Sequence, residues 1–344
     1  MNNLVDLRFL DNPEITEINT IKNHSDHKIY VNGRISSFSL NGERKFMYFN
    51  NFNDDINFLL LPNVDIRSFD SIKVPGHFEL QGYGKPKYVN QQYEWSGVED
   101  VELGKSPKNK PCGIYFKDFE MKNSLTERVI LKIDGFNTAL YLYVNGNFVG
   151  FSEKNYTSTE FDLSNYLKLG INRIAILVFK YSKMSWFNDQ DMWRFSGIFR
   201  DISINFVPFN HIFDINNRST LLDDNTTGIL DLTLSTTGDF NNTFIKSTFR
   251  FDDSILFEEI SPLTNKEFKI KKSISNVFPW TAETPSLYTL ELELIKNDRS
   301  IEKTEIKVGF RRIEIDGNVI KVNGRKIFFK VLIVMNLIWN MDVR

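Results

Sequence analysis

The chain has 344 residues, 41% of them hydrophobic and 25% charged, a length that predicts about two domains and a composition that excludes disordered and collagen-like chains. Its 42 Lys and Arg against 44 Asp and Glu give a formal net charge of −2, which argues against nucleic acid or an anionic membrane as a partner. The single cysteine, Cys112, excludes a disulfide framework and a Cys-rich zinc site, and we expect it to pack as a small hydrophobic side chain.

The first residues predict neither export nor membrane insertion. Residues 1–14 have neither the basic start nor the apolar core of a signal peptide. The longest apolar stretch, at 327–341, is interrupted by Lys330, Asn336 and Asn340, whereas a membrane helix needs about 18 apolar residues. We therefore expect a soluble, cytoplasmic protein with no membrane partner.

Two histidines, His24 and His27, lie in the motif NHSDH. Their spacing could hold a metal ion on a turn, but no neighbouring cluster of ligands completes a site. A polar surface loop is the simpler interpretation.

Tyrosines surround an asparagine in the segment 82–93, GYGKPKYVNQQY, where Asn90 lies among Tyr83, Tyr88 and Tyr93. Asparagine and tyrosine side chains can bind sugar hydroxyls and rings. The segment is equally compatible with a Gly/Pro turn whose tyrosines pack on a sheet, so alone it is a weak signal.

Alternating apolar residues and turn dipeptides predict an all-β fold. Residues 129–133 alternate and end at Asp134-Gly135, and the next apolar run, 140–144, ends at Asn145-Gly146, a strong hairpin signal. Short strands separated by about 8–12 residues are typical of β-sandwiches.

Carboxylates and tryptophans gather in the segment 186–201, WFNDQDMWRFSGIFRD. In an extended chain Asp189 and Asp191 would lie on one face, with Trp186 and Trp193 beside them. One interpretation is a solvated loop whose two arginines pair with the carboxylates. The other is a sugar site, in which carboxylates accept hydrogen bonds from hydroxyls and rings stack on C–H faces.

The composition changes after Pro208, from rich in Trp and Gly to rich in Thr, Ser and Asn. Residues 41–207 are long enough for a jelly-roll sandwich, and residues 208–316 have the length and strand spacing of an immunoglobulin-like sandwich. The 28 residues of 317–344 are too few to bury a core of their own, so we expect them to begin a further domain.

Several segments together resemble the N-terminal part of family 2 β-galactosidases, in order and in spacing, over residues 1–330. The resemblance is carried by the segments 10–27, 39–49, 74–95 (VPGHFELQGYGKPKYVNQQYEW), 134–164, 189–201 (DQDMWRFSGIFRD) and 308–330.

This resemblance implies a jelly-roll sugar-binding domain, an immunoglobulin-like domain and the truncated start of a catalytic TIM barrel at 317–344. It also implies that Asn90 and Asp191 reach into the galactose pocket and that Asp191 helps to hold a sodium ion, which suits a hard cation with oxygen ligands. The family's acid/base and nucleophilic glutamates and its magnesium ligands lie in the barrel. We therefore expect no catalytic residue in this chain.

The implied activity of the full-length enzyme is hydrolysis of terminal β-D-galactosides such as lactose, and this chain alone should be inactive. The resemblance also implies that the extended segment 1–40 supports the subunit contacts of a homo-oligomer. A non-catalytic carbohydrate-binding module is the alternative, although it should end on a closed sandwich. A separately encoded subunit is a third interpretation, which a break inside a barrel strand disfavours.

The last fourteen residues, 331–344, depart from the family pattern. Deleting one nucleotide from codons for G-V-N-R-H-E-F gives V-L-I-V-M-N-L, which matches Val331–Leu337. We therefore expect a frameshift after Lys330, arising from a disrupted gene or from a sequencing error. A genuine hydrophobic strand is the alternative, and it would be prone to aggregation if exposed.

Overall fold

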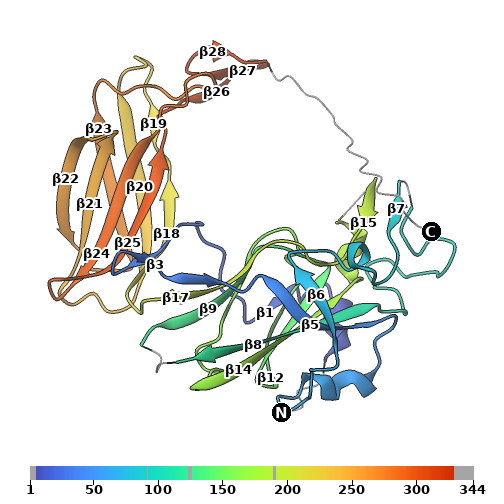
Figure 1. Ribbon diagram of the computed structural model, residues 1–344. Helices are drawn as coiled ribbons and strands as arrows, with labels where there is room; N and C mark the ends of the chain where they lie inside the picture. The colour runs from blue at the N-terminus through green and yellow to red at the C-terminus, as the bar shows by residue number, and fades with distance from the viewer. Residues whose placement is uncertain (1–4, 91, 123–125, 189–190, 329–344) are drawn as a thin grey trace. The chain divides into compact units, whose positions relative to one another are not determined.

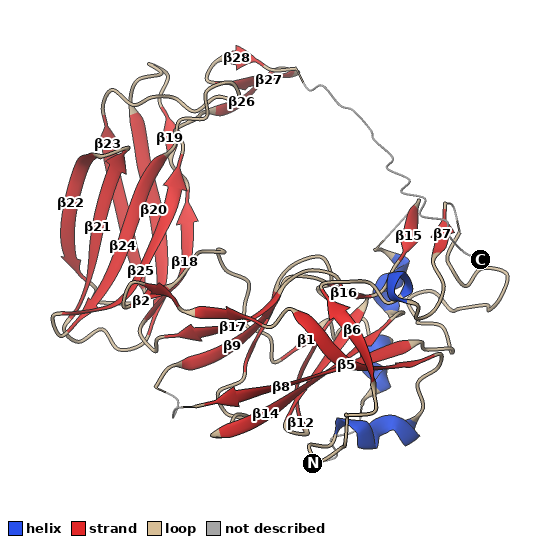
Figure 2. Ribbon diagram, in the orientation of Figure 1, coloured by secondary structure: helices blue, strands red, loops and turns tan. Residues whose placement is uncertain are grey.

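The computed structural model describes residues 5–90, 92–122, 126–188 and 191–328 (Figure 1). The chain forms two compact units, of which unit 1 contains residues 1–211 with 300–303 and unit 2 contains 212–299 with 304–344. Strands dominate both units, and in the described part of the chain the helices are short 3-10 turns (Figure 2). The predicted all-β fold is confirmed. None of the described helices is long and apolar enough to cross a membrane.

Unit 1 has two larger antiparallel sheets. The first has the order β1-β12-β11-β14-β8-β5-β6, and the second has the order β13-β9-β17-β4. The strands of the first sheet are β1 (Glu17–Ile18), β5 (Gly42–Phe49), β6 (Asp70–Val74), β8 (Cys112–Met121), β11 (Ala139–Val144), β12 (Asn147–Ser152) and β14 (Gly170–Phe179). Those of the second are β4 (Ser37–Ser39), β9 (Arg128–Ile133), β13 (Thr159–Asp162) and β17 (Ile202–Val207).

Shorter elements complete unit 1. The remaining strands pair as β2 (Tyr30–Val31) with β3 (Arg34–Ile35), β7 (Lys87–Val89) with β15 (Met192–Arg194), and β10 (Phe136–Asn137) with β16 (Gly197–Ile198). The 3-10 helices are η1 (Leu7–Leu10), η2 (Asp54–Leu60), η3 (Glu79–Gln81) and η4 (Lys183–Trp186).

Both faces of the first sheet are buried. In β11, Leu140, Leu142 and Val144 pack in a cluster shared with the second sheet. Tyr141 and Tyr143 point to the opposite face, where the N-terminal segment and η2 cover them. A strand that is buried on both faces carries a continuous apolar run, which explains why β11 (ALYLYV) shows no polar alternation.

The predicted hairpin at Asn145-Gly146 is confirmed. β11 and β12 pair across it, and both turn residues have positive φ, 50° for Asn145 and 80° for Gly146, as a two-residue type I′ turn requires. The Asn145 side chain also accepts a hydrogen bond from the Arg173 backbone N–H at 3.0 Å and donates one to the Tyr166 carbonyl at 2.9 Å. The turn is therefore anchored to the sandwich.

Cys112 is fully buried in the cluster beneath the N-terminal segment, as expected for a small hydrophobic side chain. Burial raises the pKa of its thiol, because the thiolate would lose its hydration. The cysteine is therefore a packing residue and not a nucleophile.

Unit 2 is a second β-sandwich. One sheet has the order β18-β20-β19 with β23 on the other side of β20, and the other contains β22-β21-β24-β25. In β20 every second residue is buried, including Leu230, Leu232 and Leu234. The strands are β18 (His211–Asn217), β19 (Thr220–Leu221), β20 (Gly228–Thr237), β21 (Thr243–Phe251), β22 (Ser254–Pro262), β23 (Glu267–Ile274), β24 (Tyr288–Lys296) and β25 (Arg299–Val308).

A small antiparallel sheet follows, made of β26 (Ile313–Asp316), β27 (Val319–Val322) and β28 (Arg325–Lys326). These strands are joined by hairpins, whereas a TIM barrel is built from parallel strands. The resemblance implied the start of a TIM barrel at 317–344. The described residues of this range, 317–328, show no such start. The segment for which a frameshift is expected, 331–344, lies outside the described residues.

Candidate functional site

The structure brings together the two residues that the sequence predicted to share a sugar pocket. β7 and β15 form an antiparallel ladder in which Val89 pairs with Met192 and Tyr88 with Trp193 (Figure 1). The residues that continue this ladder are Asn90 and Asp191, and the Asp191 backbone N–H donates to the Asn90 carbonyl at 3.2 Å. Asn90 and Asp191, which are far apart in the sequence, are therefore neighbours at the end of this ladder.

A tyrosine holds the Asp191 carboxylate. The Tyr88 hydroxyl donates a hydrogen bond to Asp191 Oδ1, and this bond raises the pKa of Tyr88 because a phenolate could not donate it. Asp191 has φ 58°, a left-handed conformation that aspartate tolerates better than most residues. Both Asn90 and Asp191 are exposed, so their polar groups are open to a ligand. Asp189 lies outside the described residues.

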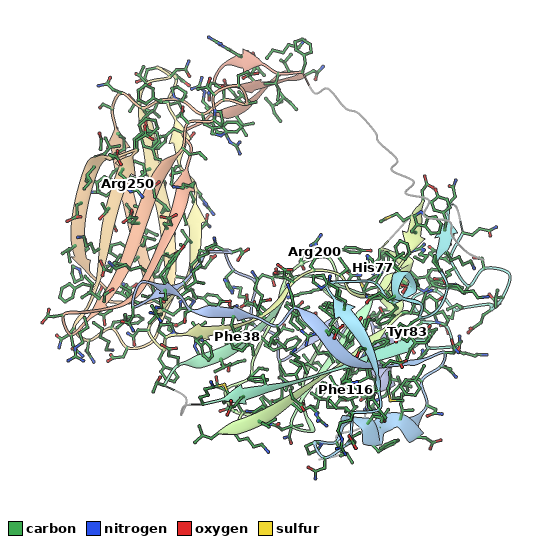
Figure 3. The ribbon with its side chains drawn as sticks, in the orientation of Figure 1. Phe38, His77, Tyr83, Phe116, Arg200 and Arg250 are labelled. Atoms are coloured by element: carbon green, nitrogen blue, oxygen red, sulfur yellow. The ribbon has the colours of Figure 1, made fainter. Side chains whose placement is uncertain are left out.

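Aromatic rings pack against one another along the ladder. Trp193 meets Tyr88 edge-on at 5.6 Å and stacks on Phe195 at 5.8 Å between ring centroids. His77 continues the stack, 5.0 Å from Phe195 and 5.3 Å from Phe199, and lies inside unit 1 (Figure 3). Trp193 remains 38% exposed. An exposed ring that is backed by other aromatic rings is suited to pack against the C–H face of a sugar.

Trp186 lies elsewhere than the sequence predicted. Its ring packs on Tyr93 at 4.4 Å and on Trp95 at 5.2 Å, and its indole N–H donates to the Lys105 carbonyl at 2.6 Å. Trp186 therefore joins two loops and is not a second ring beside Asp191. The spacing of Trp186 and Trp193 in the sequence does not indicate that the two rings lie in different places.

The two arginines proposed to pair with the carboxylates are Arg194 and Arg200, and among the described residues Arg200 contacts backbone and an aromatic ring. It donates to the Tyr156 carbonyl at 2.8 Å and lies over the Phe199 ring at 5.4 Å. Arg194 lines a neighbouring pocket, where burial lowers its pKa.

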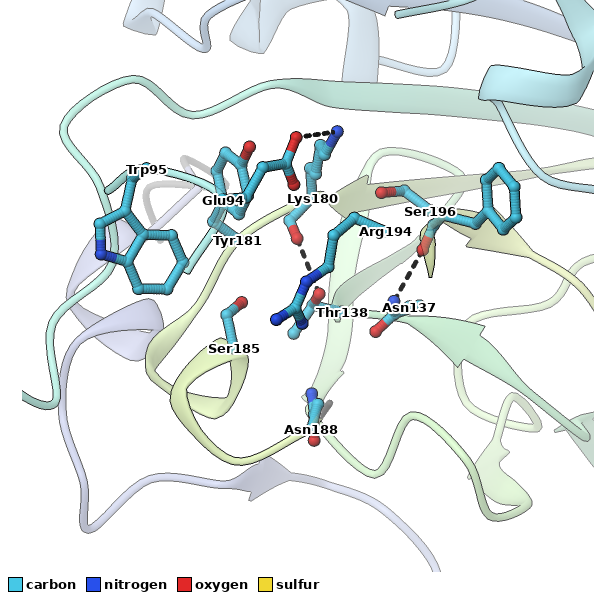
Figure 4. A pocket seen from close by; sticks show the side chains of 11 residues that line it. Glu94, Trp95, Asn137, Thr138, Lys180, Tyr181, Ser185, Asn188, Arg194 and Ser196 are labelled. Carbon is cyan, nitrogen blue, oxygen red and sulfur yellow. Dashed lines mark hydrogen bonds and ion pairs between the residues drawn. The ribbon is translucent and has the colours of Figure 1, made fainter. Parts of the chain in front are cut away.

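This small pocket lies beside the ladder and has a volume of about 20 Å³, enough for one water molecule (Figure 4). Glu94 and Lys180 form an ion pair at 2.8 Å on its wall, and a second carboxylate, Glu79, lies 3.6 Å from Lys180. Burial raises the pKa of Glu79. The sequence analysis missed these charges, since Lys180 follows an apolar strand and looks like its exposed end.

Asp191 and Asn90 can be compared with the ligands that a sodium ion would need. The carboxylate of Asp191 and the amide of Asn90 carry oxygen donors, the type that hard cations take, so the donor chemistry fits sodium. Within the described residues, no group of three or more His, Cys, Asp and Glu could hold a metal ion. His24 lies 3.0 Å from the Glu160 carboxylate, beside β13.

Comparisons with known proteins agree with these observations. Residues 37–208 match the model for the family 2 glycosyl hydrolase sugar-binding domain, and residues 210–311 match a second model of family 2 glycosyl hydrolases. The chain is 36% identical to a β-galactosidase of Streptococcus thermophilus, over 94% of this chain and 32% of the relative. It is also 36% identical to a β-galactosidase of Clostridium acetobutylicum, over 96% of this chain and 38% of the relative.

The chain thus spans about a third of the length of these relatives. Among solved structures, the β-glucuronidase of Parabacteroides merdae superimposes with a TM-score of 0.68 at 17% identity, covering 85% of this chain and 37% of that one. This likeness shows the fold alone. The two family models together extend over both sandwiches, and the chain belongs to glycoside hydrolase family 2.

Proposed function

We propose that this chain is the N-terminal, substrate-positioning third of a β-galactosidase that hydrolyses terminal β-D-galactose residues, as in lactose. The observation that carries the proposal is the juxtaposition of Asn90 and Asp191 at the end of the β7–β15 ladder, beside the exposed ring of Trp193. The names of the relatives support galactose as the sugar. In this proposal unit 1 is a jelly roll, and in the full-length enzyme a catalytic barrel follows the small sheet of β26, β27 and β28.

The residues of this site can bind and orient a sugar. A carboxylate accepts hydrogen bonds only, so Asp191 would accept from sugar hydroxyls with the oxygen that Tyr88 leaves available. The Asn90 amide can donate and accept, and the Trp193 ring can pack against a pyranose face. A sodium ion held by Asp191 would supply a positive charge beside the sugar oxygens.

These groups cannot by themselves break a glycosidic bond. A retaining glycosidase needs two carboxylates about 5–5.5 Å apart across the scissile bond, one as nucleophile and one as acid. We assign neither of them, and no magnesium ligand, to this chain. A carbohydrate-binding module without catalysis is the second candidate, favoured by the same exposed ring and carboxylate.

The test is a chimera in which residues 1–328 precede the remaining two thirds of the Streptococcus thermophilus enzyme. We expect the chimera to hydrolyse o-nitrophenyl β-D-galactoside, while the isolated chain and the isolated remainder leave it intact. Circular dichroism and gel filtration check that each protein is folded, and a second chimera with the Clostridium acetobutylicum remainder replaces one that misfolds.

Turnover by the isolated chain would contradict the assignment of this chain as a positioning part. Two folded chimeras that fail to hydrolyse the galactoside would contradict the proposed activity. If the isolated chain then still binds galactose, the carbohydrate-binding module is the correct alternative.

A further inference from the structure

Two loops lead into the β7–β15 ladder, and the N-terminal segment contacts both of them. One loop, residues 92–111, runs from β7 to β8, and the other, residues 180–188, leaves β14 towards β15. The ladder has only three residue pairs, and so short a two-stranded ribbon is not stable in water by itself. Its position, and that of Asn90 and Asp191, must therefore depend on what holds the chain on either side of it.

Lys183 ties the second loop to the N-terminal segment. It is the first residue of η4, and its side chain is only 5% exposed. Its ammonium group donates to the Phe9 carbonyl at 3.0 Å and to the Ile15 carbonyl at 2.8 Å, and it forms an ion pair with the Glu153 carboxylate. Three acceptors satisfy the three N–H donors, which is the condition under which a charged amine can be buried.

Asp11 ties the first loop to the same segment. Its Oδ1 accepts hydrogen bonds from the Ser106 backbone N–H at 2.7 Å and from the Ser106 hydroxyl at 2.6 Å. The neighbouring Lys105 carbonyl accepts from the Trp186 indole, at the end of η4. The contacts therefore form a closed ring that runs from the N-terminal segment to one loop, across to the other loop and back.

Backbone pairing holds the segment itself in place. Ile18 of β1 pairs with Phe151 of β12, and the Glu153 backbone N–H donates to the Thr16 carbonyl at 3.0 Å. Gly150 makes this approach possible, since a side chain there would collide with the Ile18 carbonyl and the Phe161 ring. The segment is therefore anchored to the first sheet of unit 1 and can hold the loops in place.

We propose that residues 6–15 brace the sugar site, and that Lys183 and Asp11 are positioning residues that fix Asn90 and Asp191 through the two loops. The brace acts within one chain and does not require a neighbouring subunit. Its effect on catalysis rests on the proposed function, whereas its effect on loop order does not. The two effects can therefore be tested separately.

The first experiment measures hydrogen exchange in the full chain. Lys183→Met keeps the length of the side chain and removes its charge, and adding Glu153→Gln avoids leaving a buried carboxylate without its partner. We expect peptides covering 92–111 and 180–194 to exchange at least tenfold faster in the double variant, while β9 and β17 exchange at the wild-type rate. The matched control is Arg8→Met, in the same segment, whose side chain is 88% exposed and should change nothing.

The second experiment separates positioning from general stability, in the chimeric enzyme. A 1 Å displacement of a binding group can lower activity by about 100-fold, so we expect the Lys183→Met, Glu153→Gln variant to lower kcat/KM by roughly 10- to 100-fold. If the brace acts through Asn90 and Asp191, the same double substitution should cost less than threefold when Asn90→Ala and Asp191→Ala are already present. A purely structural role would give equal losses in both backgrounds.

Unchanged exchange of both loops in a folded variant would overturn the brace, whatever the chimera hydrolyses. Faster exchange with equal losses in the two backgrounds would overturn the positioning role. Should the double variant fail to fold, Asp11→Ala replaces it, since it removes the oxygen that accepts from Ser106, with faster exchange expected in 92–111 only. A chimera inactive on galactosides would refute the proposed function and leave the exchange result valid.

Discussion

In the chimeric enzyme, Asp191→Ala is expected to lower kcat/KM for a β-galactoside by roughly 30- to 700-fold. The substitution removes a charged acceptor from the sugar site, and losing a hydrogen bond to a charged group there corresponds to about 2–4 kcal/mol at the transition state. The activity should also lose any dependence on sodium, because the proposed oxygen ligand is gone. Steady-state rates with sodium and with potassium as the only monovalent cation measure both effects.

Asp189→Ala is the matched control for this substitution, since it removes an identical side chain two positions away. We expect it to retain activity within a few-fold of the wild type and to keep its response to sodium. Near wild-type activity in both variants would show that Asp191 is not the residue in the pocket.

Phe46→Ala is expected to destabilise unit 1 by about 3–5 kcal/mol, because the core around it cannot close over the lost ring. Phe46 is fully buried and packs against Tyr83 at 4.8 Å, Tyr115 at 4.9 Å and Phe78 at 5.4 Å between ring centroids. Gly113 on the adjacent strand leaves room for the ring, and a Cβ there would lie 2.5 Å from Phe46 Cζ. Phe58→Ala, at a side chain that is 57% exposed, should cost less than about 1 kcal/mol.

Urea unfolding followed by tryptophan fluorescence measures this difference. Trp280→Phe and Trp339→Phe in the background leave Trp95, Trp186 and Trp193, all in unit 1, as the reporters. Equal shifts of the midpoint for Phe46→Ala and Phe58→Ala would contradict the packing described for the sandwich.

The sequence predicted the fold where one local signal decides it. The alternation at 129–133, which lies in β9, and the Asn145-Gly146 turn were sufficient, because a strand and a type I′ turn each leave a pattern in adjacent residues. The continuous apolar run of β11 indicates burial on both faces, but it does not show what covers the second face. The N-terminal segment, which lies far away in the sequence, covers that face.

The candidate site was predictable only in part. Asn90 and Asp191 were found through resemblance, and their adjacency depends on a ladder whose strands, KYV and MWR, are too short to give a pattern. Lys183 gave no signal, because a buried lysine is defined by its acceptors, which come from residues more than 100 positions away and from Glu153. Long-range polar contacts of this kind leave no local periodicity.

The central claim is that Asn90 and Asp191, which are neighbours at the end of the β7–β15 ladder, bind the same sugar. A double-mutant cycle in the chimeric enzyme tests this claim most directly. Asn90→Ala, Asp191→Ala and the double variant are compared by kcat/KM on o-nitrophenyl β-D-galactoside. Because the residues adjoin, we predict a double variant that loses less than the product of the two single losses, with a coupling of about 0.5–3 kcal/mol. Single losses that multiply, or the absence of any loss, would contradict a shared sugar site.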